Sequence, residues 1–265
     1  MKLFVASSSL VAKPLISTLL VSKDHQLLGL ITNPDKATGR GMQIEANELA
    51  TWAQSEKIQT YKPSTHDEIR LIIEKDKPDL VITIAYGQLI PEPLLDLPKH
   101  GWINVHFSTL PKWRGAATVQ WAILNGDKES GVSIFKLERG MDTGPIFSTK
   151  RFALDDDITS DELFIELAAL GVEAVEESLQ DIAQGKRPIA QPKEGATRAL
   201  KITKQECEID WSQDAQTISQ KIRAFTSIPG AWTRFRADTV KLDSVAITEL
   251  SFAPGSIQVI DKVLV

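Results

Sequence analysis

The chain has 265 residues, a net charge of −5 and 42% hydrophobic side chains, which predicts a globular protein of one or two domains. The acidic balance argues against a large nucleic-acid interface, although a local basic patch can exist within an acidic chain. No apolar run is long enough to span a membrane, the N-terminus lacks the pattern of a secretory signal, and a single cysteine excludes an internal disulfide. We therefore expect a cytoplasmic protein without a membrane partner.

Short apolar runs alternate with helical segments in the first half of the chain. Most of these runs are nearly continuous in apolar residues, as in parallel strands that are buried on both faces. Helices are predicted between them over residues 13–22, 47–55 and 67–75. This alternation is typical of an α/β domain with a doubly wound, mostly parallel sheet. The predicted strands are KLFVA (2–6), LLGLIT (27–32), LVITIAYG (80–87), WINVHF (102–107) and VSIFKL (132–137).

A longer helix is predicted after the alternation. Thr159 and Glu162 have the spacing of a capping box, which is typical of the first turn of a helix. Apolar residues then recur at the helical period until Gly185 and Pro188 interrupt the pattern. The helix therefore closes the first part of the chain.

The remaining sequence predicts a linker and a second, smaller unit. Residues 187–203 are rich in Pro, Gly and polar residues and have little periodicity. One helical segment, 215–225, and several short strand-like runs follow. We expect a first domain over 1–186 and a short, largely β domain over 204–265.

Two polar residues interrupt the predicted strand WINVHF. Side chains alternate between the faces of a strand, so Asn104 and His106 point to one face and the apolar residues to the other. Ligand sites in such folds lie at the carboxyl ends of strands, where this strand runs into a turn-rich loop. Asn104 can donate a hydrogen bond to a developing oxyanion, and His106 can donate one or transfer a proton. The alternative is that backbone groups satisfy both, but two such residues on one face favour a functional site.

A second candidate lies in the segment ERGMDTGPI. Gly140 and Gly144 flank Asp142 in a tight turn between two strand-like runs. Asp and Gly are common turn residues, so a plain hairpin turn is one interpretation. Together with Asn104 and His106, the other interpretation is an acid that orients or charges the histidine and thereby tunes proton transfer.

The segment NPDKATGRGMQ follows the second predicted strand and carries Lys36 and Arg40 among glycines. A solvated charged loop is the more common structure for such a segment, and a loop that contacts phosphate groups is the alternative. No G-x-G-x-x-G follows the first strand and no Walker motif occurs, which argues against nucleotide cofactors held by those motifs. The spacing of His, Cys, Asp and Glu predicts no metal site.

The segment INVHFSTLPKWRGAATVQWAILNGD, with GMDTGPI after it, resembles the signature of the 10-formyltetrahydrofolate-dependent formyltransferases. That signature is an Asn-x-His pair, a Ser-Leu-Leu-Pro-like loop and a later Asp-Thr/Ser-Gly. Further segments are similar to the family members that act on methionyl-tRNA, and the resemblance runs along nearly the whole chain. These segments are NPDKATGRG, VITIAYGQLIPEPLLDLP, WRGAA and KITKQECEIDWSQDAQTISQKIRAF.

The resemblance implies a transferase of translation initiation. Its substrates would be 10-formyltetrahydrofolate and initiator methionyl-tRNA, whose free α-amine would attack the formyl carbon directly. Asn104 and His106 would stabilise the oxyanion of the tetrahedral intermediate, and Asp142 would bias the charge of the histidine and help to relay protons. Neither a metal nor a covalent enzyme intermediate is implied.

The resemblance also implies where the two substrates bind. Lys36 and Arg40 would contact the tRNA acceptor arm, and the 204–265 domain would be an OB-like barrel that also touches the tRNA. We expect the enzyme to be a monomer. The residues implied for the folate are Tyr86, Gly87, Leu89, Ile90, Ser108, Leu110, Pro111 and Asp142.

Several residues depart from the family pattern. Residues 7–9 are Ser-Ser-Ser in place of Gly-Thr-Pro, and Thr109 and Thr118 stand where Leu and Pro are usual. The 204–265 domain and its preceding residues from 201 carry eight basic and eight acidic residues. Since phosphate attraction needs a positive excess, tRNA binding would rest more heavily on the Arg40 loop.

Three other functions are compatible with parts of the pattern. A sugar-nucleotide N-formyltransferase would share the three catalytic residues, but NPDKATGRG and KITKQECEIDW favour tRNA. A non-catalytic RNA- or folate-binding relative would fit the loop departures, but Asn104, His106 and Asp142 are all present. A nucleotide-dependent oxidoreductase on the same architecture is disfavoured by the missing glycine motif.

Overall fold

The computed structural model describes the chain except for residues 39–41, 251–252, 257–258, 261–262 and 265. Its centre is a seven-stranded sheet in the order β10-β9-β7-β6-β1-β2-β5. Strands β7, β6, β1, β2 and β5 run parallel to one another. Strand β9 is antiparallel to both of its neighbours, β7 and β10. The strands are β1 (Lys2–Ala6), β2 (Gln26–Ile31), β5 (Thr60–Tyr61), β6 (Leu80–Thr83), β7 (Trp102–His106), β9 (Glu129–Lys136) and β10 (Ile146–Ala153).

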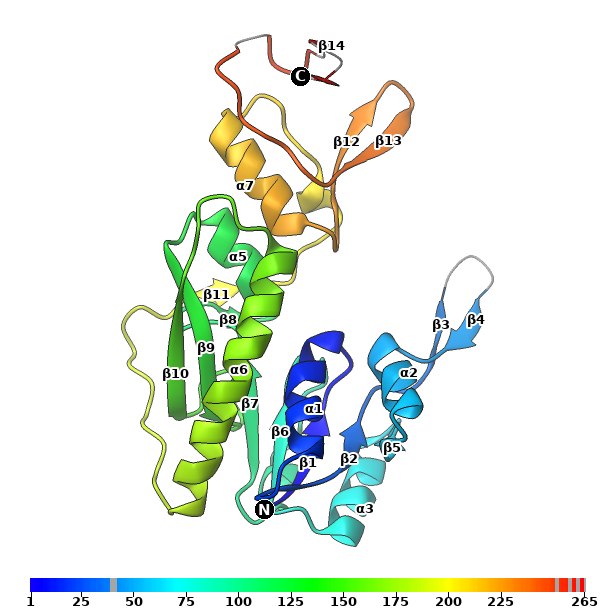
Figure 1. Ribbon diagram of the computed structural model, residues 1–265, viewed down its shortest axis with the longest axis vertical. Coiled ribbons are helices and arrows are strands. Elements are labelled where there is room, and N and C mark those ends of the chain that lie inside the picture. The colour runs from blue at the N-terminus through cyan, green and yellow to red at the C-terminus, as the bar shows by residue number, and fades with distance from the viewer. Residues whose placement is uncertain (39–41, 251–252, 257–258, 261–262, 265) are drawn as a thin grey trace.

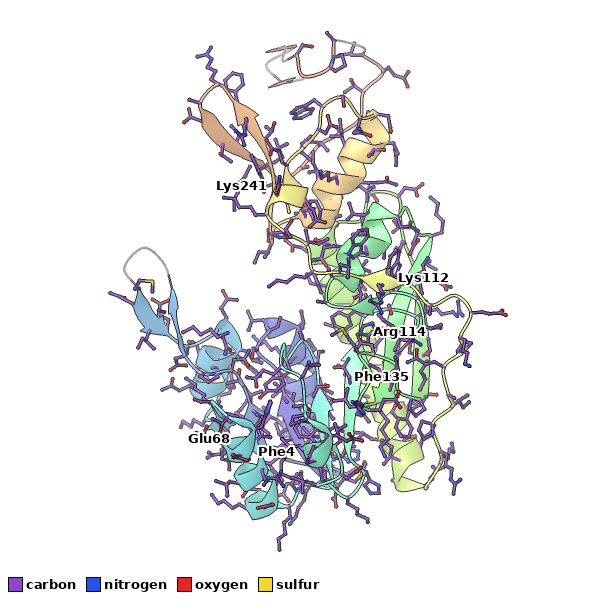
Figure 2. The ribbon with its side chains drawn as sticks, turned by 180° about the vertical axis from the view of Figure 1, so that it is seen from behind. Phe4, Glu68, Lys112, Arg114, Phe135 and Lys241 are labelled. Carbon is purple, nitrogen blue, oxygen red and sulfur yellow. The ribbon has the colours of Figure 1, made fainter. Side chains whose placement is uncertain are left out.

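Helices cover both faces of this sheet, which confirms the doubly wound arrangement. One apolar layer contains Leu15 and Leu163 from α1 and α6, which lie along one face (Figure 1). The opposite layer contains Ile69 of α3 and Phe4 of β1, which is labelled in Figure 2. The helices are η1 (Leu10–Ala12), α1 (Lys13–Leu20), α2 (Glu48–Ser55), α3 (His66–Asp76), α4 (Glu92–Leu95), α5 (Thr118–Leu124) and α6 (Ser160–Ala183).

The predicted capping box of α6 is present. The Thr159 hydroxyl accepts a hydrogen bond from the Glu162 N–H, and the Glu162 carboxylate accepts one from the Thr159 N–H at 2.9 Å. Such a cap satisfies N–H groups that have no partner within the helix and stabilises it by about 1 kcal/mol. Gly185, just past the helix end, has a φ of 72°, which a glycine adopts without strain.

The chain reverses direction across the sheet between β1 and β6. It runs from β1 outward to β5 and then returns to the other side of β1, so the loops after β1 and β6 leave the sheet in opposite directions. In folds of this kind a crevice for ligands opens at that point, at the carboxyl ends of the strands. The predicted strand over 80–87 was too long, since β6 ends at Thr83. Ala85 and Gly87 have φ values of 46° and 75°, which end the extended conformation.

The segment expected to be a loop after β2 is a hairpin. Strands β3 (Lys36–Thr38) and β4 (Gln43–Glu45) pair antiparallel and project beyond the carboxyl ends of the parallel strands (Figure 1). Lys36 lies on the first of these strands and is exposed. Arg40 lies outside the described residues.

The described residues of the C-terminal part form one longer helix, a short 3₁₀ helix and two β-hairpins. Its helix α7 (Ala215–Phe225) packs on α5 through Ile222 and Phe225, which join the apolar layer beneath α6. The two hairpins form separate sheets within the described part of the chain. The remaining elements are η2 (Gln205–Cys207), β12 (Ala231–Phe235), β13 (Asp238–Leu242), β14 (Val259–Ile260) and β15 (Val263–Leu264).

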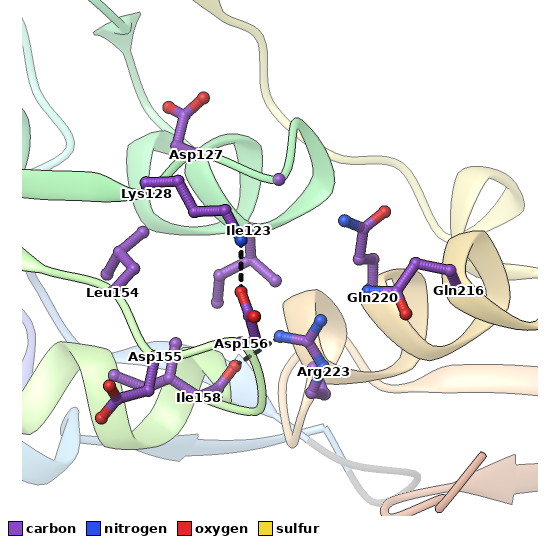
Figure 3. A pocket seen from close by; sticks show the side chains of 11 residues that line it. Ile123, Asp127, Lys128, Leu154, Asp155, Asp156, Ile158, Gln216, Gln220 and Arg223 are labelled. Carbon is purple, nitrogen blue, oxygen red and sulfur yellow. Dashed lines mark hydrogen bonds and ion pairs between the residues drawn. The ribbon is translucent and has the colours of Figure 1, made fainter. Parts of the chain in front are cut away.

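A charged pocket marks the junction between α7 and the first part of the chain (Figure 3). Lys128 and Asp156 form an ion pair there. Arg223 of α7 donates from Nη1 to the carbonyl oxygen of Ile158 at 2.9 Å. These contacts, together with the apolar packing, fix α7 against the first part.

The predicted linker is attached to the first part of the chain instead of crossing freely to the second. Strand β11 (Arg198–Ala199) pairs parallel with β8 (Arg114–Gly115) in the loop after β7. Trp121 Nε1 donates to the carbonyl oxygen of Leu200, and Trp232 Nε1 donates to that of Lys204, both at 2.8 Å. The connection to the C-terminal unit is therefore held at both ends.

Candidate active site

Asn104 lies near the carboxyl end of β7, beside Thr83 of β6. It faces away from α6, whereas its neighbours Ile103 and Val105 pack in the layer under that helix, as the alternation predicted. The Thr83 hydroxyl donates to Asn104 Oδ1 at 2.7 Å. The amide nitrogen of Asn104 has no hydrogen-bond partner among the described residues, so it can donate to a bound group.

His106 is buried two residues further along the strand, and its side chain is 6% exposed. Nε2 lies 2.9 Å from the carbonyl oxygen of Trp113. Because a carbonyl only accepts, Nε2 carries the proton and the neutral ring has its lone pair on Nδ1. Burial lowers the pKa of His106, and the charge of Asp142 and the Trp113 carbonyl oppose this shift. Near neutral pH the ring is therefore uncharged, with an acceptor at Nδ1.

Asp142 lies in the turn between β9 and β10, next to the histidine. Its Oδ2 is 3.9 Å from His106 Nδ1 and accepts a hydrogen bond from the Gly115 N–H at 2.8 Å. The backbone of Asp142 has a φ of 53°, an uncommon value for a residue other than glycine. The structure thus places the Asp142 carboxylate next to His106, which lies two residues along β7 from Asn104.

The loop after β6 lies at the crevice, but its tyrosine side chain is directed elsewhere. Tyr86 is buried in the apolar layer under α3, its hydroxyl has no partner among the described residues, and burial raises its pKa to about 12. Its carbonyl oxygen accepts a hydrogen bond from Asn33 Nδ2 at 3.2 Å. By contrast, Leu89 is 73% exposed and the space beside Gly87 is open. Ile90 is half-buried against the same layer.

The other residues implied for the folate shape the loop after β7. The Ser108 hydroxyl donates to the carbonyl oxygen of Lys112 at 2.6 Å, and the Leu110 N–H donates to Ser133 Oγ at 3.0 Å. Ser108 and Leu110 are both buried, and Pro111 is half-buried. These side chains hold the loop in its conformation, and its accessible groups are therefore mainly backbone.

The serines that replace the family's Gly-Thr-Pro form hydrogen bonds with neighbouring residues at the carboxyl ends of β1 and β2. Ser8 Oγ accepts from the Asn33 N–H at 3.1 Å and lies 3.3 Å from Thr32 Oγ1. Ser9 accepts from the Val11 N–H and begins the short helix η1. The departure thus ties the end of β1 to the end of β2.

Sequence reasoning missed the contribution of the linker to this site. Thr197 Oγ1 accepts from the Trp113 N–H at 2.8 Å, and the Thr197 carbonyl accepts from the Arg114 N–H at 2.9 Å. Because Trp113 also binds His106 Nε2, the linker supports the carbonyl that sets the histidine tautomer. The polar residues of the linker were the one signal in the sequence that could have indicated these contacts. Periodicity does not reveal hydrogen bonds between residues far apart in the chain. Thr83 was missed in the same way.

Gly115→Ala should disrupt the contact between loop and linker. The φ of Gly115 is 128°, and a Cβ there would lie 2.3 Å from the carbonyl oxygen of Ala199. We expect the free energy of unfolding to fall by about 2 kcal/mol because the backbone must strain or shift. Thermal and denaturant unfolding would measure this, with the exposed neighbour substituted as Ala116→Ser for control. A Gly115→Ala protein as stable as this control would contradict the close approach.

Comparisons with known proteins show the family of this chain. A model of the family described as "Formyl transferase" matches residues 1–179, and one described as "Formyl transferase, C-terminal domain" matches 201–265. The chain belongs to the formyl transferase family. A methionyl-tRNA formyltransferase of Streptomyces avermitilis is 37% identical over 264 residues, which cover 98% of this chain and 85% of that protein.

Solved structures of formyl transferase relatives share the fold. The methionyl-tRNA formyltransferase from Clostridium thermocellum superposes with a TM-score of 0.65 at 18% identity, covering 94% of each chain. HypX from Aquifex aeolicus in complex with tetrahydrofolic acid gives 0.74 at 19% identity, covering 97% of this chain and 40% of that one. The fold class predicted from sequence is therefore confirmed.

The described residues contain neither a metal-binding cluster nor a membrane-spanning helix. No cluster of three or more His, Cys, Asp or Glu side chains in this part of the formyl transferase chain could hold a metal ion. Likewise, no helix within the described ranges combines the length and apolar character needed to cross a membrane. Cys207 is buried, and burial raises the pKa of its thiol.

Proposed function

We propose that this protein transfers the formyl group of 10-formyltetrahydrofolate to the α-amine of initiator methionyl-tRNA. The observation that carries this proposal is the placement of Asn104, His106 and Asp142 at one strand end beside the crevice of the sheet. Relatives of 36–38% identity along nearly the whole chain, named methionyl-tRNA formyltransferase, support the acceptor. We further propose a cytoplasmic enzyme that works as a monomer.

The three residues take different parts in this reaction. Asn104 donates from its amide nitrogen to the oxyanion that forms when the amine attacks the formyl carbon. His106 accepts a proton of the attacking amine at Nδ1, because Nε2 is engaged by Trp113. Asp142 stabilises the resulting imidazolium from 3.9 Å. The imidazolium then donates this proton to the folate nitrogen, so that the bond between this nitrogen and the formyl carbon breaks and tetrahydrofolate leaves.

The formyl donor fits the loop that follows β6 and the crevice beside it. A pterin is a flat ring with hydrogen-bonding edges, and such a group suits an exposed apolar side chain next to an open backbone. Leu89 supplies the first, and the turn at Gly87 supplies the second. The loop at Ser108, Leu110 and Pro111 would form the opposite wall, with Asp142 at its end.

The domains divide the work between the substrates. We propose that residues 1–186 form the catalytic domain, that 187–203 link it to the rest, and that 204–265 form a short OB-like domain that contacts tRNA. The β3–β4 hairpin and the C-terminal unit both project beyond the carboxyl ends of the parallel strands (Figure 1). A long acceptor is therefore better suited to this molecule than a small one.

One assay tests the proposal. The purified protein, 10-formyltetrahydrofolate and charged initiator tRNA should give formylmethionyl-tRNA, measured by acid gel or by mass spectrometry of the released amino acid. An amino-sugar nucleotide serves as the competing acceptor. Formylation of the sugar alone would replace tRNA by a sugar nucleotide as the acceptor, and formylation of neither would indicate a non-catalytic relative.

Arg40→Ala, or Lys36→Ala on the described part of the hairpin, should weaken tRNA use selectively. We expect KM for charged tRNA to rise about tenfold, because remote contacts position the amine, while KM for the folate stays unchanged. The slope of log(kcat/KM) against log salt should flatten by roughly 0.7 to 0.9 for one lost phosphate contact. Lys23→Ala is the matched control, because Lys23 is exposed and lies just before β2, at the amino ends of the parallel strands. Unchanged tRNA kinetics would exclude the hairpin from the tRNA site.

A further inference from the structure

Gln191, in the predicted linker, is hydrogen-bonded to the turn that carries Asp142. Its Nε2 donates to the carbonyl oxygens of Asp142 and Gly144, at 2.9 and 2.8 Å. Its Oε1 accepts from Nε and Nη2 of Arg114, at 3.1 and 2.6 Å. Two N–H groups and two acceptor sites are all that a primary amide offers, so the side chain is fully engaged. This degree of engagement fixes its position.

The turn needs such support because of its backbone conformation. Asp142 has a left-handed φ of 53°, which is unfavourable for a residue with a Cβ, and the surroundings must hold it there. On one side Gly144 packs against β9 so closely that a Cβ would lie 1.8 Å from the carbonyl oxygen of Lys136. On the other side Gln191 binds the two carbonyls. The turn is thus clamped between a strand and the linker.

The same contacts fix the carboxylate relative to the histidine. Gln191 joins Asp142 to Arg114, and the next residue, Gly115, donates its N–H to Asp142 Oδ2 at 2.8 Å. Backbone and side chain of Asp142 are therefore bound to one segment, residues 114–115. Arg114 is labelled in Figure 2, on the side of the molecule that also carries Phe135. The 3.9 Å separation of Oδ2 from His106 Nδ1 depends on this closed set of contacts.

We propose that Gln191 is a positioning residue for formyl transfer, which holds the Asp142 carboxylate at His106 from the linker. This inference rests on the proposed function for its kinetic effect, although the placement of the carboxylate does not. Among the described residues, Asp142 is the charged group next to the His106 ring. The ring also lies edge-on to Phe135 and is hydrogen-bonded to the Trp113 carbonyl. Moving the carboxylate away therefore changes the titration of His106.

The test uses two substitutions with different losses. Gln191→Leu has a similar size and removes every hydrogen bond. Gln191→Glu keeps the acceptor for Arg114 but cannot donate to the two carbonyls, and it places a negative charge beside Arg114. Gln184→Leu makes the same change at an exposed position at the end of α6 and is the matched control. Circular dichroism and thermal unfolding verify that each variant is folded.

Both Gln191 variants should lower kcat by about 10- to 100-fold, because a small displacement of a catalytic group has effects of this size. KM for methionyl-tRNA and for 10-formyltetrahydrofolate should change less than threefold. The pKa of His106, followed by NMR of its Cε1–H and assigned with His106→Ala, should fall relative to the wild type. Gln184→Leu should match the wild type in all three measurements.

A Gln191→Glu enzyme with the wild-type kcat and the wild-type His106 titration would overturn the proposal. So would a loss of kcat without any change in that titration, since it would indicate a general structural role. If the wild-type protein formylates no methionyl-tRNA, the proposed function fails. The His106 titration in the Gln191 variants still decides whether the linker positions Asp142.

Discussion

His106→Ala and Asn104→Ala should each lower kcat/KM for formyl transfer by about 100-fold, with folding retained. One lost hydrogen-bond donor to an oxyanion has an effect of this size, and so does a lost general base. Both side chains lie at the end of a strand whose apolar neighbours remain packed under α6, so the fold does not depend on them. Steady-state kinetics with methionyl-tRNA would measure both losses.

The pH dependence distinguishes the two roles. In the wild type, kcat/KM should fall below the pKa of His106, because a protonated ring cannot accept a proton; burial places this pKa below the ordinary histidine value. That limb should disappear in His106→Ala and persist in Asn104→Ala, while the limb of the substrate amine remains in both. A rate within a few-fold of the wild type would remove the altered residue from the site.

Asp142→Asn should also be impaired by about 100-fold, although the two side chains have nearly the same shape. The amide can still accept from Gly115, but it carries no charge to stabilise the imidazolium that forms at His106. The charge of Asp142 raises the pKa of His106 in the wild type. Its removal lowers that pKa further, so the acidic limb of the pH–rate profile should move to lower pH. Kinetics over pH 5–9 would measure both effects, within roughly the range in which histidine and α-amino groups titrate.

Asp96→Asn is the matched control, because Asp96 is exposed at the end of α4. It should have the rate and the pH profile of the wild type. If Asp142→Asn shares both, Asp142 is only a turn residue, and the assignment of charge stabilisation to it is wrong.

Local patterns allowed much of the fold to be predicted. The capping box at Thr159, the helix over 215–225 and the alternation along β7 all depend on residues a few positions apart. Their outcome follows from hydrogen bonding at a helix end and from the period of a strand. The strand end at Thr83 was less predictable, because an apolar run does not reveal where the backbone turns left-handed at Ala85.

The sequence suggested Asn104, His106 and Asp142 as site residues, but it did not reveal the residues that hydrogen-bond to this part of the chain. The polar positions on one strand face made Asn104 and His106 identifiable, and the family signature added Asp142. The roles of Thr83, Thr197 and Gln191 rest on hydrogen bonds across 21 to 84 positions of the chain. Short-range periodicity carries no information on such pairs. The family resemblance implies a folate contact for Tyr86, whereas its ring packs in the apolar layer under α3, beyond the end of β6.

The attachment of the linker at Leu200 and Lys204 has a consequence for tRNA affinity. A freely jointed connection would leave the C-terminal unit many orientations, and binding a large acceptor would then remove that rotational freedom. Here the hydrogen bonds from the Trp121 and Trp232 indoles and the β8–β11 pairing restrict this rotation when the chain folds. The loss of rotational entropy therefore occurs when the chain folds and not when the acceptor binds. Each contact with the acceptor then contributes a larger share of its free energy to the affinity. A C-terminal unit with equal numbers of acidic and basic residues can therefore contribute to tRNA binding without an excess of positive charge, because its orientation is already fixed.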